Sequence, residues 1–370
     1  MQKLYIWCSA LLLTVLSQAS QAQILIGQTA GFTGPVSASV KEMTEGAKLY
    51  IDTINAEGGV NGQKIELISL DDKFDPKLAL ENGRQLIEDK NVLAMFLTRG
   101  TSHTEALLPL LDKYAVPLIG PSTGAMVLHK PVKKHIFNVR GMYQREAEKA
   151  MVYLHSRGIT RIGIVYPDNS FGADGVAGAQ KGMATVKLSP TILESFDRNK
   201  PDFAAITPNL IKANVQAVLM IGSGQAVVDG IKALRTAGST AQIVTLSNNA
   251  SNGFIQNLGE NARGVLVTQV FPPDNSAAFS LIREAQKLAR IKGLTDISPA
   301  TLEGFAAAKV LVEGLRRAGP KPTRDKLQAA LENLHKFDIG GLDVSYAPDD
   351  HTGLDFADLA IIGNNGKFKR

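Results

Sequence analysis

Residues 97–125 read LTRGTSHTEALLPLLDKYAVPLIGPSTGA, and this stretch sets the pattern for the whole chain. The apolar runs Val92–Leu97 and Val116–Ile119 are short and unbroken, which predicts two buried strands of a parallel sheet. Between them, residues of helical spacing recur: Ala106, Leu107, Leu110, Leu111 and Tyr114. Two strands joined through a helix in this way predict the crossover unit of an α/β sheet.

Each of these predicted strands is followed by a small turn that is rich in hydroxyl groups. The two turns are Gly100-Thr101-Ser102 and Gly120-Pro121-Ser122-Thr123-Gly124. Ligands of open α/β sheets bind beyond the carboxyl ends of the strands, and free N–H groups at helix N-termini favour anions. The two turns therefore predict half of a socket for a carboxylate. The alternative is that Ser102 and Thr123 merely cap the helices that follow.

The same alternation of strands and helices occurs twice along the chain. The first set of strands is expected at Ile24–Thr29, Lys64–Leu70, Val92–Leu97, Val116–Ile119 and Ile136–Val139. The second set is expected at Arg161–Tyr166, Thr191–Phe196, Ala217–Ile221, Gln242–Leu246 and Gly264–Val270. This pattern predicts two doubly wound α/β lobes with parallel sheets. If the first lobe presents its turns to a cleft, the second should present Phe171, Ser223 and residues 247–249 from the other side.

The alternation is interrupted at three places, which we interpret as crossings between the lobes. They are Arg140-Gly141, Phe271-Pro272-Pro273 and residues 336–340. The predicted lobes are then residues 23–140 plus 271–337, and residues 141–270 plus 338–370. In the tail, Gly340–Tyr346 and Phe356–Ile362 flank a turn and predict a β-hairpin.

The N-terminus predicts a secretory signal peptide of residues 1–22. Lys3 precedes an apolar run from Leu4 to Leu16, and Ser20-Gln21-Ala22 is a small-x-small signal for cleavage after Ala22. The run is shorter than the roughly 20 apolar residues that span a bilayer, so stable membrane insertion is not expected. The single cysteine, Cys8, lies in this segment. The mature chain would therefore have no disulfide or thiol nucleophile, which suits a bacterial periplasm.

Composition and motifs argue against several other classes of function. The 370 residues are 44% hydrophobic and 20% charged, which is typical of a globular chain of two domains. The net charge of +5 is spread without a dense basic tract, so nucleic-acid binding is not expected. His129 and His135 do not have metal-ligand spacing, and 222–224 is only a fragment of a dinucleotide fingerprint. We therefore expect neither a metal nor a cofactor.

Several segments together resemble type I periplasmic solute-binding proteins, in the leucine/isoleucine/valine-binding branch. The matching segments are GQTAGFTGPVSASVKEMTEGAKLYIDTINAEGGVNGQKIEL at 27–67, LDDKFDPKLA at 70–79, VPLIGPSTGA at 116–125, YPDNSFGADGVAGAQKG at 166–182 and GVLVTQVFPP at 264–273. The resemblance covers most of the mature chain. It implies two lobes joined by three crossovers, a ligand held in the cleft, and delivery of that ligand to an ABC transporter permease. It also implies a monomer.

The resemblance places the carboxylate site of an amino-acid ligand on Thr101-Ser102 and Ser122-Thr123-Gly124. It places the apposing aromatic side chain of the second lobe on Phe171. The acid that pairs with the ligand's ammonium in branched-chain binders would fall near Ser247, but residues 245–250 read TLSNNA. This segment contains no acid.

A buried ammonium without a carboxylate partner is costly, so we expect a ligand with no cationic group, or a loosely held zwitterion. An aromatic or aliphatic acid, or an amide, fits this expectation, with neutral polar contacts from Ser223, Ser247 and Asn249. Arg99 either adds a charge-assisted bond to an anion or forms a salt bridge at the surface or hinge.

Two alternatives to transport come from the same sequence. The first is a periplasmic receptor that senses its ligand for a membrane signalling protein. The second is an enzyme, but the expected cleft offers no nucleophile together with an oriented base and an orienting acid. We therefore expect no catalysis.

Overall fold

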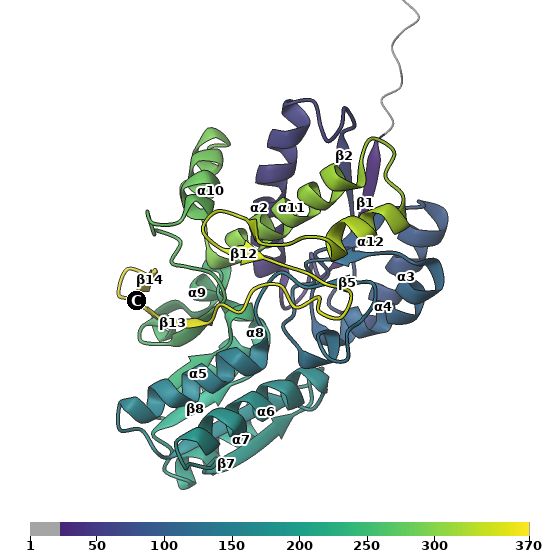
Figure 1. The fold of residues 1–370 in the computed structure, drawn as a ribbon. Helices are drawn as coiled ribbons and strands as arrows, with labels where there is room; N and C mark the ends of the chain where they lie inside the picture. Colours follow the sequence, from purple (N-terminus) through teal and green to yellow (C-terminus); the bar gives the residue numbers. More distant parts are fainter. Residues whose placement is uncertain (1–22, 370) are drawn as a thin grey trace, which may run out of the picture.

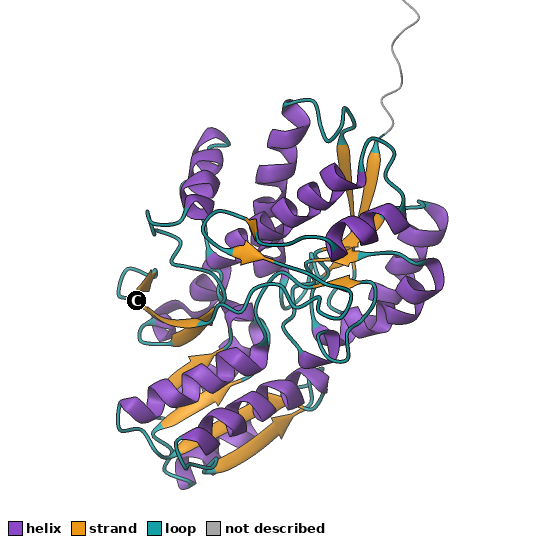
Figure 2. Ribbon diagram, viewed as in Figure 1, coloured by secondary structure: helices purple, strands orange, loops and turns teal. Residues whose placement is uncertain are grey.

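The computed structural model describes residues 23–369 and contains two α/β units, each built around its own sheet (Figures 1 and 2). We call the unit with strands β1–β5 the first lobe and the unit with strands β6–β10 the second lobe. The predicted signal peptide, residues 1–22, lies outside the described residues. The expected fold class, two α/β lobes with parallel sheets, is confirmed.

The sheet of the first lobe has five parallel strands in the order β2-β1-β3-β4-β5. The strands are β1 Ile24–Ala30, β2 Ile65–Asp71, β3 Ala94–Phe96, β4 Leu118–Ile119 and β5 Ile136–Phe137. The connecting segments are α2 Ser37–Ala56, α3 Pro76–Arg84, the π-helical turn η1 Gln85–Asp89, α4 Thr101–Tyr114 and the 3₁₀ turn η2 Met126–Leu128. The chain reverses its direction of winding between β1 and β3, which makes this the switch point of the sheet.

The sheet of the second lobe has seven strands in the order β14-β13-β10-β9-β8-β6-β7. Its parallel strands are β6 Ile162–Pro167, β7 Ile192–Phe196, β8 Ala217–Met220, β9 Gln242–Thr245 and β10 Leu266–Gln269. Its helices are α5 Tyr143–Ser156, α6 Ser170–Thr185, α7 Phe203–Lys212, α8 Gln225–Thr236 and α9 Asn252–Leu258, with 3₁₀ turns η3 Ser247–Asn249 and η4 Gly259–Ala262. The switch point of this sheet lies between β6 and β8.

Three late helices return to the first lobe: α10 Ser280–Ile291, α11 Pro299–Ala318 and α12 Arg324–Glu332. Helix α11 packs closely along α2, as Figure 1 shows. Two glycines permit this approach, because a Cβ on Gly46 would lie 1.9 Å from the Thr301 carbonyl oxygen, and one on Gly304 would lie 1.8 Å from that of Met43. Within residues 23–369, no helix has the length and apolar character needed to cross a membrane.

The tail does not form the predicted hairpin between Gly340–Tyr346 and Phe356–Ile362. Strand β11 Phe337–Asp338 pairs instead with β12 Asp343–Val344, while β13 Asp358–Ile362 pairs antiparallel with β10 and with β14 Phe368–Lys369. Each of the two predicted hairpin segments pairs with another strand instead. Asp338 accepts the N–H groups of Gly340 and Gly341, which closes a tight local turn, and β13 covers the free edge of β10.

The packing of the tail also differs from the predicted division into lobes. Ile339, Val344, Tyr346 and Leu354 are buried in the core of the first lobe, although residues 338–370 were expected in the second. The Tyr346 hydroxyl donates a hydrogen bond of 2.6 Å to the Asn138 carbonyl oxygen, which holds this segment beside the first crossing. We propose that the third crossing lies after Leu354, because the chain joins the second sheet only at β13.

Candidate functional site

A cavity of about 640 Å³ lies between the carboxyl ends of the strands of the two sheets. Residues from six strand-end turns line it, three turns from each lobe. The turns follow β1, β2 and β3 in the first lobe (Pro35, 73–77 and 99–103) and β6, β7 and β8 in the second (167–171, 196–199 and 222–226). Both switch points therefore face the same space, which is where open α/β sheets bind ligands.

Five of the ten predicted site residues line this cavity: Arg99, Thr101, Ser102, Phe171 and Ser223. Thr101 and Ser102 belong to the first turn of α4, and no side chain caps that helix. The capping alternative for Ser102 is therefore not what the structure has. Backbone N–H groups in the first turn of a helix have no partner within the helix, so this turn favours an anion.

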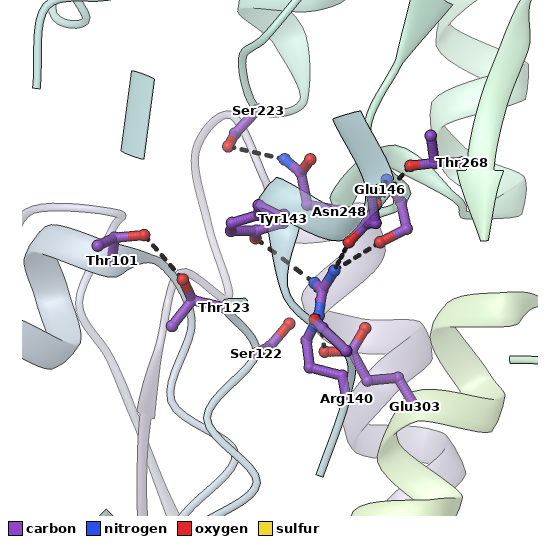
Figure 3. A network of polar contacts seen from close by, with 12 residues as sticks. Thr101, Ser122, Thr123, Arg140, Tyr143, Glu146, Ser223, Asn248, Thr268 and Glu303 are labelled. Atoms are coloured by element: carbon purple, nitrogen blue, oxygen red, sulfur yellow. Dashed lines mark hydrogen bonds and ion pairs between the residues drawn. The ribbon is translucent and has the colours of Figure 1, made fainter. Parts of the chain in front are cut away.

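Ser122, Thr123 and Gly124 lie one strand away from the switch point, after β4, and support the cavity wall from behind. The hydroxyls of Thr123 and Thr101 share a hydrogen bond of 2.7 Å, which Figure 3 shows. The Ser122 N–H donates to the Thr98 carbonyl oxygen at 2.7 Å, which continues the pairing of β3 and β4 beyond the strands. A Cβ on Gly124 would lie 2.4 Å from the Gly141 carbonyl oxygen, so this glycine packs against the first crossing.

Ser247 and Asn249 lie after β9 and do not line the cavity, which disagrees with the expectation that they touch the ligand. The Ser247 hydroxyl accepts a hydrogen bond of 2.6 Å from Arg140, and its N–H donates to Glu146 at 2.9 Å. The Asn249 amide donates to the Gly222 carbonyl oxygen and accepts the Gly224 N–H. Ser247 therefore contacts the first crossing, and Asn249 contacts the turn after β8. Neither reaches the cavity, because β9 is one strand beyond the switch point.

Ser247, near which an ammonium-pairing acid was sought in the sequence, contacts a buried ion pair of the protein. Figure 3 shows this pair, which Arg140 and Glu146 form. Arg140 pairs with Glu146, which also accepts a hydrogen bond from the Thr268 hydroxyl. Glu303 of α11 is 3.9 Å from Arg140. Burial alone would lower the pKa of Arg140, but nearby Tyr143, Glu303 and Glu146 outweigh it and raise that pKa.

Arg99 connects the two lobes inside the wall of the cavity. Its side chain is buried, with 2% of the residue exposed. Nη1 donates to the Ser122 carbonyl and hydroxyl oxygens at 3.3 Å each, and Nη2 donates to the Asn248 carbonyl oxygen at 2.7 Å. Nε has no hydrogen-bond partner within residues 23–369. Within the described residues Arg99 therefore forms no salt bridge, which was the alternative left open in the sequence analysis, and all of its partners there are neutral oxygens.

The remaining polar wall consists of residues that the sequence analysis missed or set aside. Arg198 of the second lobe donates to the Phe74 carbonyl oxygen of the first lobe at 2.7 Å, and lies 3.2 Å from Nε2 of His103. The Phe74 ring stacks on His103 with centroids 4.4 Å apart, and the guanidinium of Arg198 lies 4.4 Å from the centre of the same ring. Burial, followed by the charge of Arg198, lowers the pKa of His103 to about 3, so this imidazole is neutral. No pattern in the polar loop around Arg198 could have indicated this reach across the cleft.

Aromatic side chains form the apolar part of the wall: Phe74, Tyr143, Phe171 and Phe196. Phe171 lies where it was expected, with its ring 4.9 Å from that of Tyr143. Further contacts join the lobes beside the cavity, including the Ser170 hydroxyl donating to Glu105 at 2.5 Å and the Gln225 N–H donating to the Pro35 carbonyl oxygen at 3.1 Å. A cavity between two contacting lobes is typical of two-lobed ligand-binding proteins.

The family follows from comparison with known proteins. A family model described as periplasmic binding protein matches residues 23–366. The chain therefore belongs to the periplasmic binding protein family, with a type I fold of the Leu/Ile/Val-binding kind, and the resemblance described from the sequence is confirmed.

Individual relatives agree with this assignment. Leu/Ile/Val-binding protein homolog 3 of Brucella melitensis is 24% identical over 323 residues, which cover 86% of this chain and 85% of that protein. The crystal structure of a substrate-binding periplasmic protein from Ralstonia solanacearum matches with a TM-score of 0.86 and 30% identity, covering 94% of this chain and 99% of that one. A possible leucine/isoleucine/valine-binding protein from Rhodopirellula baltica has the same fold, with a TM-score of 0.89 and 24% identity over 96% and 98% of the two chains. The homologues are substrate-binding proteins, not enzymes.

Proposed function

We propose that this protein is the periplasmic substrate-binding component of an ABC importer, and that its lobes close around a small carboxylate-bearing solute. The observation that carries the proposal is the cavity between the two switch points, with Arg99 in its wall. The family supplies the context of transport, since homologues in it bind small molecules for ABC transporter permeases.

The chemistry of the wall supports an acid as the ligand. Arg99 is buried without an acid partner among the described residues, and a buried charge is costly unless it is paired. The first turn of α4 adds hydroxyl groups and helix N–H groups beside it. A carboxylate bound there would neutralise the charge of Arg99 and accept hydrogen bonds from Thr101 and Ser102.

The aromatic wall supports a ligand body that is flat or apolar. Phe171 belongs to the second lobe, and Tyr143 begins α5 just after the first crossing. Phe74, on the other side of the cavity, belongs to the first lobe. Such a body gains contacts on both sides only when the lobes are together, so ligand binding would shift the population toward the closed form. The permease would then recognise the closed protein.

Isothermal titration of the mature protein with a panel of organic acids tests this proposal. The panel contains benzoate, 3-phenylpropanoate, 4-methylpentanoate and 4-methyl-2-oxopentanoate, with the corresponding amides. Mass spectrometry of any solute released by mild denaturation extends the panel beyond these choices. We expect micromolar binding or tighter for at least one acid, and loss of that binding in its amide. The proposal would be contradicted if no acid of the panel binds and mass spectrometry finds no acid among the released solutes.

The proposed location can be checked on the same preparation. Export with cleavage after Ala22 predicts that the N-terminal residue of protein recovered from the periplasm is Gln23. N-terminal sequencing of that fraction measures this directly, and an intact residue 1 would contradict it. We also propose that the mature protein is a monomer, which light scattering measures.

A further inference from the structure

Arg99 holds the acceptor groups that a ligand's ammonium would need in this part of the site. Within the described residues, its guanidinium binds the Ser122 carbonyl oxygen of the first lobe and the Asn248 carbonyl oxygen of the second. These two carbonyls follow β4 and β9 and approach the same guanidinium from opposite sides of the cleft. A cation that used either of them would share the oxygen with the guanidinium of Arg99, and the two positive charges would lie side by side.

The nearest acid to the same turn is also occupied. Glu146 reaches the Ser247 N–H, one residue before Asn248, but its carboxylate pairs with Arg140 and accepts the Thr268 hydroxyl. The second acid in this region, Glu303, lies 3.9 Å from Arg140 as well. Both acids beside the turn after β9 therefore face an arginine of the protein. Asp75, which lines the cavity from the turn after β2, accepts the Lys77 N–H as the cap of α3.

One polar atom of Arg99 has no hydrogen-bond partner within residues 23–369. This atom, Nε, is buried, while the residue itself lines the cavity. An N–H of a guanidinium is a strong donor to a carboxylate and is repelled electrostatically by an ammonium. The arrangement thus favours one sign of charge and opposes the other.

We propose that Arg99 is the specificity-determining residue of this protein: it substitutes for the ligand's ammonium and selects organic acids that have no α-ammonium group. This inference rests on the proposed function and deepens it by naming the ligand class that is rejected. It also assigns Arg99 a second role, because the same two bonds tie the lobes together in the closed form.

The test uses pairs of ligands with the same carbon skeleton. L-leucine is compared with 4-methylpentanoate and 4-methyl-2-oxopentanoate, and L-phenylalanine with 3-phenylpropanoate, by isothermal titration of the mature protein. We expect the acid without the amino group to bind about 100-fold more tightly than its amino acid in at least one set. Like charges held side by side weaken binding, and 100-fold corresponds to two factors of ten in Kd.

The variant Arg99→Met removes the guanidinium but keeps a side chain of similar length. We expect weaker binding of the acid and a preference over the amino acid that falls at least about tenfold, because the Ser122 and Asn248 carbonyls become free for an ammonium. Arg157→Met, at an exposed position on the second lobe, is the matched control and should keep the preference of the wild type.

The outcomes separate this inference from the proposed function. If the acids bind the wild-type protein no more tightly than their amino acids do, the role of Arg99 is overturned. The proposed binding of carboxylates would still stand in that case. An unchanged preference in a folded Arg99→Met variant would overturn it equally. Failure of every acid to bind would overturn the proposed function and this inference together. If Arg99→Met does not fold, the wild-type comparison can still overturn the inference.

Discussion

Arg99 and Arg140 are both buried and both reach the turn after β9, yet their partners differ. Arg140 donates to the Ser247 hydroxyl and pairs with Glu146, while Arg99 donates to the neighbouring Asn248 carbonyl oxygen. One guanidinium therefore has its countercharge within the protein, and the other has only neutral oxygens. This difference separates a side chain that holds the crossing together from one that we propose to bind an anion.

The largest effect is expected when Arg140 is removed. In Arg140→Met, the carboxylates of Glu146 and Glu303 remain buried without their cation, which should lower the free energy of unfolding by about 3–5 kcal/mol. Urea denaturation of the ligand-free protein measures this loss. The double variant Arg140→Met/Glu146→Gln should lose less than the sum of the two single variants, and strict additivity would contradict the ion pair.

An intermediate effect is expected from Asp174, a buried acid that has no cation partner within residues 23–369 and in this respect is the counterpart of Arg99. It accepts hydrogen bonds from the Gln144 side chain at 2.7 Å and the Met126 N–H at 3.2 Å. Burial raises its pKa from 3.8 to about 6, although the bond from Gln144 opposes this shift. A raised pKa means that the folded state holds the proton more tightly than the unfolded state does.

Stability should therefore fall as the pH rises from about 4 to about 6, and level off above that range. The shift of about two pKa units corresponds to a loss of up to about 3 kcal/mol. Asp174→Asn keeps the acceptor oxygen and removes the titration. Urea denaturation between pH 4 and 7 should give a shallower curve for this variant, with the contribution of Asp72, whose pKa is also raised to about 6, still present. Parallel curves would contradict the assignment.

The smallest effect on stability is expected from Arg99→Met in the ligand-free protein. Lost bonds to Ser122 and Asn248 are offset by removal of a buried charge that has no acid partner, so the net change should be about 1 kcal/mol or less. The same Arg→Met change thus serves as a matched pair at positions 99 and 140. Equal losses of unfolding free energy at the two positions would remove the distinction between them.

The sequence located most of the strand ends correctly, because short apolar runs followed by hydroxyl-rich turns are local signals. Thr101, Ser102, Phe171 and Ser223 were found in this way, as residues of the turns beside the two switch points. Residues 247–249 were expected at the cleft by the same argument, but β9 is one strand beyond the switch point. The Ser247 hydroxyl accepts from Arg140, and the Asn249 amide donates to the Gly222 carbonyl oxygen. The hairpin in the tail failed because β13 pairs with a strand almost a hundred residues earlier.

The sequence by itself thus determined two α/β lobes, the turns that end their strands and the family, since each of these depends on local periodicity or on segments in a fixed order. Only the tertiary structure decided which charges meet. Glu146 lies on the inward stripe of α5, and its acid is brought to Ser247 by folding, while Arg198 reaches Phe74 from the opposite lobe. Contacts between segments this far apart depend on how the two lobes pack, and no local pattern records that packing.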